Sequence, residues 1–153
     1  MHHPIASLFS KDFPEFASQL RMGKGQPIEE VKSGLSNEEL LLLEATHKIT
    51  FPESFKRFLS LCGGIWLSGG TIQLGWSNIF RHPNRMLCFG EYSLEADGDQ
   101  VLFDISSGLI RREYRVYYYD HEHRPPRYVK LADSFRGFIE NLLQNRRVND
   151  EST

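Results

Sequence analysis

The residues of this chain that could do chemistry gather between positions 91 and 123. One acidic stretch holds Glu91, Glu95, Asp97, Asp99 and Asp104, with no Lys or Arg between its ends. Paired carboxylates can transfer protons or bind a cation. Aspartates beside a glycine also shape turns, so a turn with solvated acidic neighbours is favoured over a catalytic pair. An acidic rim that steers a basic protein partner stays open as a second interpretation.

A second candidate is the segment 120–123, Asp-His-Glu-His. In an extended strand His121 and His123 would point to the same side, at a spacing that can hold zinc once further ligands arrive. No cluster of Cys, His or Asp elsewhere offers those ligands, and a polar strand end leading into Pro125 and Pro126 explains the pattern better. We therefore predict no metal and no cofactor, and assign both histidines to a candidate partner-binding surface.

Neither cysteine is expected to act as a nucleophile. Cys62 and Cys88 lie in apolar runs, whereas a reactive thiol needs an electropositive, partly open setting. We expect two buried, reduced thiols, as in a cytosolic protein. The glycine pairs at 63–64 and 69–70 lack the Lys-Ser/Thr that follows in a phosphate-binding loop. The sequence thus predicts no catalytic residue and no enzyme.

Aromatic residues form a last candidate surface: Trp66, Trp76, Tyr117, Tyr118 and Tyr119. Most are expected in the core. Because neighbouring residues of a strand point to opposite faces, at least one of the three tyrosines should face outward, and Tyr118 is our candidate anchor for a partner.

These residues must be positioned by helices and strands, and one predicted helix organises the rest. The stretch 49–64 predicts a helix that begins at Pro52, with Gly63 and Gly64 ending it in the left-handed conformation. Apolar residues at helical spacing give it one buried face: Phe55, Phe58, Leu59 and Cys62. Burial of this face, more than helix propensity, is expected to hold the helix.

Other elements follow from the hydrophobic period. Helices are predicted over 12–22 and 37–47, the second opened by a Ser36–Glu39 capping box, with a loop over 24–34. Strands are predicted over 65–67, 71–74, 86–91, 101–104, 115–119 and 128–130, and a last helix from Phe135. This order favours an α+β fold, with a largely antiparallel sheet of about six strands packed against N-terminal helices and a C-terminal helix.

The chain of 153 residues suits one domain, with a core at about 35–143 and flexible ends at 1–8 and 146–153. Its net charge of −2 argues against a nucleic-acid partner held by bulk charge. No run approaches a membrane span, and the first residues do not read as a secretory signal, so a cytoplasmic location without membrane contact is expected.

Four segments, in this order and spacing, resemble the SUKH superfamily: ITFPESFKRFLSLCGG, CFGEYSLEADGDQVLFD, RVYYYDHEH and LADSFRGFIENLL. The likeness covers about Leu35 to Leu143. The superfamily contains the Smi/Knr-type cell-wall assembly regulators and many bacterial toxin-immunity proteins. The resemblance implies an α+β fold and a non-enzymatic protein partner, either a toxin that the chain neutralises or a host protein for which it is a scaffold. The acidic stretch favours a basic toxin domain, whereas a metal-dependent enzyme built on the histidines is the least favoured alternative.

Overall fold

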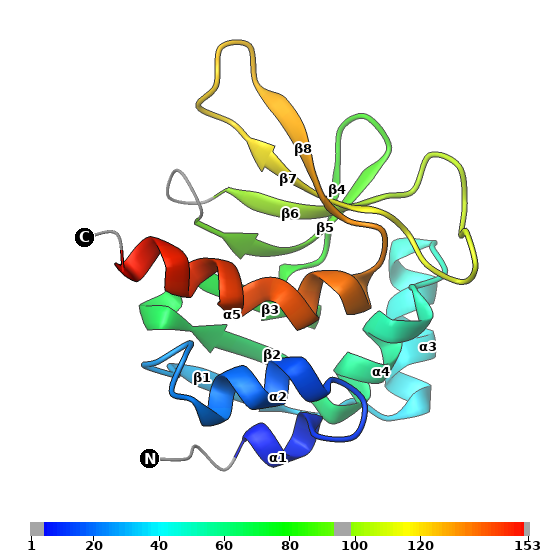
Figure 1. Ribbon diagram of the computed structural model, residues 1–153. Helices are drawn as coiled ribbons and strands as arrows, with labels where there is room; N and C mark the ends of the chain where they lie inside the picture. The colour runs from blue at the N-terminus through cyan, green and yellow to red at the C-terminus, as the bar shows by residue number, and fades with distance from the viewer. Residues whose placement is uncertain (1–4, 94–98, 152–153) are drawn as a thin grey trace.

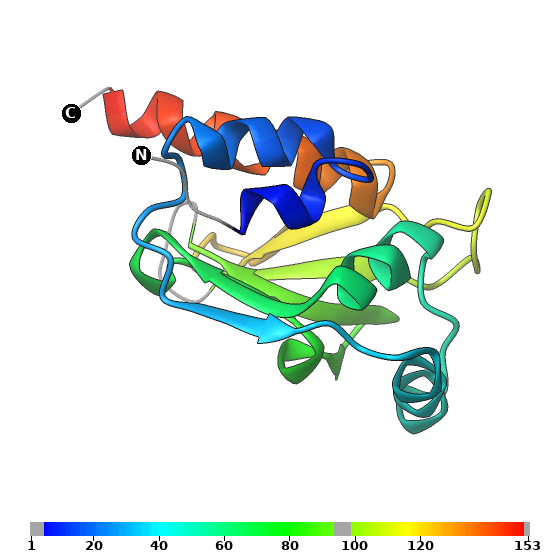
Figure 2. The ribbon, with the colours of Figure 1, turned by 90° about the horizontal axis from the view of Figure 1, so that it is seen from below.

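A single antiparallel sheet is covered on one face by helices (Figures 1 and 2). The computed structural model describes residues 5–93 and 99–151, with side chains as far as residue 144. The predicted α+β class with a largely antiparallel sheet is confirmed.

Within the described residues the sheet has eight strands, in the order β1-β2-β3-β5-β6-β7-β8, and β4 pairs with the first half of β5 on the same side as β3. Their bounds are Glu30–Ser33 (β1), Cys62–Leu67 (β2), Ile72–Gly75 (β3), Phe80–His82 (β4), Met86–Tyr92 (β5), Gln100–Asp104 (β6), Val116–Asp120 (β7) and Arg127–Ala132 (β8). The sequence predicted about six strands. The additional strands β1 and β4 are short, and β1 falls in the predicted loop, because four mostly exposed residues carry no alternating apolar signal.

In the part of the chain that the structure describes, five helices accompany the sheet: α1 (Ala6–Phe9), α2 (Pro14–Arg21), α3 (Asn37–His47), α4 (Glu53–Leu61) and α5 (Phe135–Glu151). Short 3-10 turns, η1 (Ser68–Gly70) and η2 (Trp76–Asn78), follow β2 and β3. Helices α1, α2, α4 and α5 form the layer over one face, whereas α3 lies apart from this layer (Figure 2).

The core lies between this helical layer and the sheet. Phe135 of α5 is at its centre, with ring contacts to six other phenylalanines: Phe13, Phe55, Phe58, Phe89, Phe103 and Phe138. The predicted buried face of α4 is confirmed for Phe55, Phe58 and Leu59, which are fully buried. Cys62, the fourth residue of the predicted face, is also buried but is the first residue of β2. Packing of aromatic rings therefore joins α4, α5 and the central strands.

The N-terminal end of the chain contributes to this core more than the sequence indicated. Residues 1–4 lie outside the described part, but Ile5, Ala6 and Phe9 are buried. The prediction that residues 1–8 are flexible is therefore wrong for the last residues of that range, which pack with α2. At the other end, α5 continues to Glu151.

Gly63 and Gly64 do not end α4, which corrects the predicted role of both glycines. The helix ends at Leu61, and both glycines lie inside β2. A Cβ atom on Gly63 would lie 2.5 Å from the Ser33 carbonyl oxygen, and one on Gly75 would lie 2.5 Å from the Gly64 Cα. Glycine is required here for close approach of β1, β2 and β3.

Candidate protein-binding surface

One row of residues crosses the sheet on the face that the helical layer leaves uncovered. Directly opposed partners connect it from β1 to β8, so its members lie side by side. In order they are Glu30, Trp66, Gln73, Glu91, Gln100, Tyr119 and Tyr128, all at least partly exposed. For the five central members, both chain neighbours are buried. We call this surface the open face.

At the β8 end of the open face, aromatic and imidazole side chains pack together. The ring of His82 lies 4.7 Å from that of Tyr119, edge to face, and its Nε2 lies 3.2 Å from the Tyr128 hydroxyl. Asn84 donates a hydrogen bond of 2.8 Å to the same hydroxyl. This arrangement rests on a small second core of Met86, Cys88 and Leu102. The aromatic side chains are therefore fixed, and can contact a partner at little cost in conformational entropy.

His82 should make stability depend on pH. Burial lowers the pKa of His82 from 6.5, and the Gln100 side chain opposes this shift. Below pH 6.5 the unfolded chain therefore binds a proton that the folded chain resists, so the free energy of unfolding falls as the pH falls. We expect His82→Gln to have a smaller fall between pH 7 and pH 5.5, measured by urea denaturation. Equal falls in variant and parent would contradict this assignment; part of the fall remains in either case, because burial also lowers the pKa of His47.

Glu91 lies in the middle of the open face, opposite Gln73 on β3 and Gln100 on β6. It is half-buried, and within the described ranges no hydrogen bond or ion pair to its carboxylate is found. A carboxylate between two amides and flanked by aromatic side chains favours a cationic side chain as its partner. Of the described residues of the acidic stretch, Glu91 is the one that lies in the open-face row.

An apolar groove of about 410 Å³ lies where α3, the end of β1 and η2 meet. Its apolar lining consists of Leu35, Leu42, Leu43 and Trp76. Lys32 extends over the Trp76 ring, with its Nζ 4.9 Å from the ring centroid, and donates a hydrogen bond of 3.2 Å to the Ser77 hydroxyl. The groove therefore adds an apolar hollow at the β1 end of the molecule, opposite the tyrosines of β7 and β8.

Asp99 of the acidic stretch is not part of a solvated rim. Asp99 is 0% exposed and accepts a hydrogen bond of 2.6 Å from His121 Nδ1 if that nitrogen carries the proton. Glu95 and Asp97 lie outside the described residues. The prediction of Asp99 as a partner-binding residue is therefore wrong, because its carboxylate is held inside the molecule by a histidine 22 residues away.

The two histidines of the predicted zinc spacing have separate partners. Nδ1 of His121 faces Asp99, and Nδ1 of His123 lies 2.7 Å from the Pro125 carbonyl oxygen. An Asp–His pair can also orient a general base. The second ring nitrogen of His121, Nε2, lies 3.8 Å from the Glu122 carboxylate, which is not a group that a base would activate. In the described part of the chain, no three His, Cys, Asp or Glu side chains come together as a metal site requires.

Tyr118 is buried, at 2% exposure, so the prediction that it faces a partner is wrong. Its neighbours Tyr117 and Tyr119 point to the open face and pack on its small core. The sequence predicted that neighbouring residues of this strand face opposite sides of the sheet, but not which of them face the core. Trp66, predicted only as one of several aromatic residues, could have been placed on the open face, because it stands between two apolar residues of a strand.

The SMI1 / KNR4 family (SUKH-1) is the family whose model matches this chain, over residues 34–141. The chain belongs to this family. The predicted likeness to the SUKH superfamily is thus confirmed, over more than half of the chain. Among curated proteins, none matches significantly.

The matched segment of this SUKH-1 chain begins after β1 and ends within α5, and so contains six of the seven residues of the open-face row. Helices α1 and α2 and strand β1 precede it. The open face is therefore built mainly on the part that defines the family, whereas one wall of the groove comes from residues before it. Among the described residues, no helix has both the length and the apolar character needed to span a bilayer.

The cysteines of this SUKH-1 chain are buried and unpaired, as predicted. Burial raises the pKa of Cys62 to about 11 and that of Cys88 to about 12, against partial compensation by backbone hydrogen bonds. Because the thiolate is the reactive form, we expect alkylation of Cys62 by iodoacetamide at pH 8 to be about 100-fold slower in the folded than in the unfolded protein. Mass spectrometry with and without urea measures this; rapid labelling of the folded protein would contradict it.

Proposed function

We propose that this SUKH-1 chain is a non-enzymatic protein-binding domain, and that it is an immunity protein that binds and neutralises a cognate toxin in the cytoplasm. The observation that carries the proposal is the open face, where aromatic side chains and the carboxylate of Glu91, unpaired within the described ranges, lie in a single row on the side of the sheet away from the helical layer. Aromatic residues of this kind are common anchors in protein interfaces.

Support also comes from the family, whose known members include immunity proteins. Two candidate reaction centres of the described residues are disfavoured, since burial raises the pKa of both thiols and the two predicted histidines contact separate partners. Neutralisation would then require only that the chain cover a working surface of the toxin. Affinity would come from buried aromatic side chains, and orientation from charge.

Co-expression tests this proposal. The chain is produced together with each toxin domain encoded next to it, and growth is expected to be restored with one of them. A stable complex of the two purified proteins should accompany the rescue. Failure with every neighbouring toxin, together with recovery of an endogenous host complex in a pull-down, would instead support the scaffold role. Turnover of a small molecule with a stoichiometric metal would support an enzyme and contradict the proposal.

A charge reversal locates the surface. Glu91→Arg places a cation in the middle of the open face and should weaken toxin binding at least tenfold, or about 1.4 kcal/mol. Glu15→Arg makes the same change on α2, in the helical layer on the other side of the sheet, and should leave binding unchanged. Calorimetric titration of both variants gives the comparison. Equal effects would mean that net charge, and not the open face, determines binding.

A further inference from the structure

Helix α3 exposes leucines in a way that its own packing does not explain. Of its eleven residues only Leu40 is buried, whereas Leu41 is 65% and Leu42 is 68% exposed. Leu42 lines the groove beside Trp76, but Leu41 does not. Exposed leucines on one helix, next to a preformed apolar groove, are typical of a surface that another chain covers.

The groove adjoins a free sheet edge. Strand β1 is the first strand in the sheet order, and in the described part of the chain its outer edge pairs with no other strand. Its last two residues, Lys32 and Ser33, also line the groove. An edge strand offers unpaired backbone groups to an extended segment of another protein. Backbone pairing and an apolar hollow are therefore available at one place.

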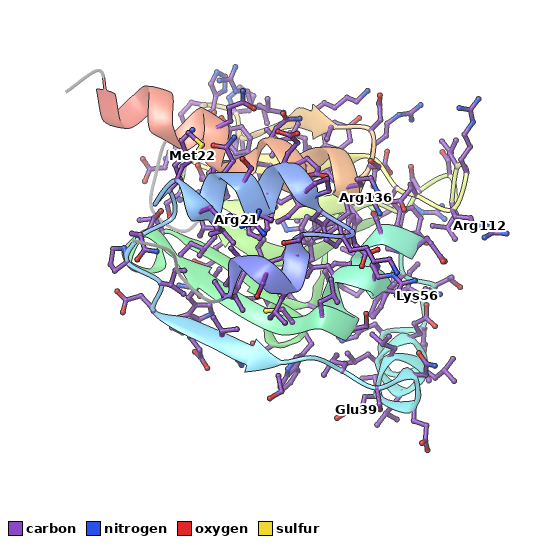
Figure 3. The ribbon with its side chains drawn as sticks, turned by 60° about the horizontal axis from the view of Figure 1, so that its bottom comes forward. Arg21, Met22, Glu39, Lys56, Arg112 and Arg136 are labelled. Atoms are coloured by element: carbon purple, nitrogen blue, oxygen red, sulfur yellow. The ribbon has the colours of Figure 1, made fainter. Side chains whose placement is uncertain are left out.

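The charges around this place are mostly negative. Four carboxylates surround the edge and the groove, and all four residues are exposed: Glu29, Glu30, Glu38 and Glu39. Lys32 is the cation that lines the groove, and it is engaged with Trp76 and Ser77. Lys56 and Arg57 of α4 line a separate hollow beside Asn37 and Leu40, and each of these cations is paired with a carboxylate, Glu44 and Asp12 respectively. Figure 3 shows Arg21 and Arg136 on α2 and α5, away from the label of Glu39 on α3. This imbalance favours a positively charged occupant.

We propose that the occupant is an extended, basic segment of the partner protein, which pairs with the outer edge of β1 and places one large apolar side chain in the groove between Leu42 and Trp76. The carboxylates of β1 and α3 then face lysine or arginine side chains on either side of that anchor. This inference rests on the proposed function, which supplies a partner protein. It adds what family membership does not give, namely that the partner's bound segment is extended and basic. It also makes Leu42 the residue most directly under the anchor.

Peptide selection tests the inference without a known partner. A phage-displayed library of random 12-residue peptides is selected on the purified chain. Enriched peptides are expected to carry Lys or Arg on both sides of a large apolar residue. Their binding should fall at least tenfold on Leu42→Glu and stay within twofold of the parent on Leu41→Glu. The two variants add the same charge to the same helix at equally exposed positions, so only the groove distinguishes them.

Hydrogen exchange supplies the second readout. A selected peptide should slow exchange of backbone amides in β1 and in the first turn of α3, and raised salt should weaken its binding. No enrichment, enrichment of acidic peptides, or binding that survives Leu42→Glu would overturn the inference. If Leu42→Glu still neutralises a toxin that the parent neutralises, the proposed function stands and this docking site is wrong.

Discussion

Phe135→Ala should lower the free energy of unfolding by about 3–5 kcal/mol, because the variant leaves a cavity at the centre of the aromatic core. The ring of Phe135 lies between 5.1 and 6.4 Å from those of its six phenylalanine neighbours. These neighbours come from α4, α5, β5, β6 and the start of α2, so surrounding groups cannot all move inward to fill the space. For a domain of this size the loss corresponds to a fall of roughly 6–20 °C in Tm.

Urea denaturation measures this effect, with the m-value as a check that the extent of unfolding is unchanged. Phe58→Ala, which removes ring contacts with Phe9, Phe13 and Phe135, should fall in the same range. Phe80→Ala is the control, because Phe80 is 45% exposed on the short strand β4, and its removal should cost less than about 1 kcal/mol. A loss of that small size for Phe135→Ala would show that the core is described wrongly.

Glu113→Ala should cost about 2–4 kcal/mol, because one carboxylate holds the first turns of two helices. Its Oε2 accepts a hydrogen bond of 2.9 Å from the Ser54 backbone N–H in α4. Its Oε1 accepts from the Ser54 hydroxyl at 2.8 Å and from the Phe135 N–H at 3.3 Å, at the start of α5. The Ser54 hydroxyl oxygen in turn accepts a hydrogen bond of 3.1 Å from the Arg136 N–H. Negative charge at both positive helix ends adds to the effect.

Glu113→Gln separates the two contributions. The amide keeps one acceptor oxygen but loses the charge, so we expect roughly half the loss seen for alanine. Glu122→Ala is the control, since Glu122 is well exposed and should change stability by no more than about 0.5 kcal/mol. Denaturation curves for the three variants give the ranking. Equal losses for Glu113→Ala and Glu122→Ala would contradict the capping role.

Local patterns in the sequence were sufficient for most elements of the fold. The capping box of α3 is formed as predicted, with Glu39 N–H donating to Ser36 Oγ at 3.1 Å and Ser36 N–H donating to Glu39 Oε1 at 2.9 Å. The buried stripe of α4, the hairpin at 68–70 and the strand containing the three tyrosines were also predicted correctly. Each depends on residues a few positions apart, where the spacing alone determines which side chains share a face.

Features that depend on close backbone packing were not predictable. The turn at Arg111 and Arg112 has positive φ at both residues, 53° and 68°, without the Gly or Asn that normally indicates it. The flanking residues Ile110 and Glu113 pair across this turn, which brings the Glu113 carboxylate to the helix ends. Contacts with α4 and α5 supply the energy for an unfavourable turn conformation, and a single sequence contains no local signal of it.

For the proposed binding surface, the sequence by itself determined that aromatic side chains alternate along β7, that the thiols lie in apolar surroundings and that no catalytic set is evident. Only the tertiary structure decided that Tyr118 faces the core and Tyr119 the open face. It also decided that Asp99 is buried in contact with His121, and that Glu91 lies in the same row as Trp66. The physical reason is that periodicity is set by local backbone geometry, whereas the choice of covered face and strand register is set by contacts between segments far apart in the chain.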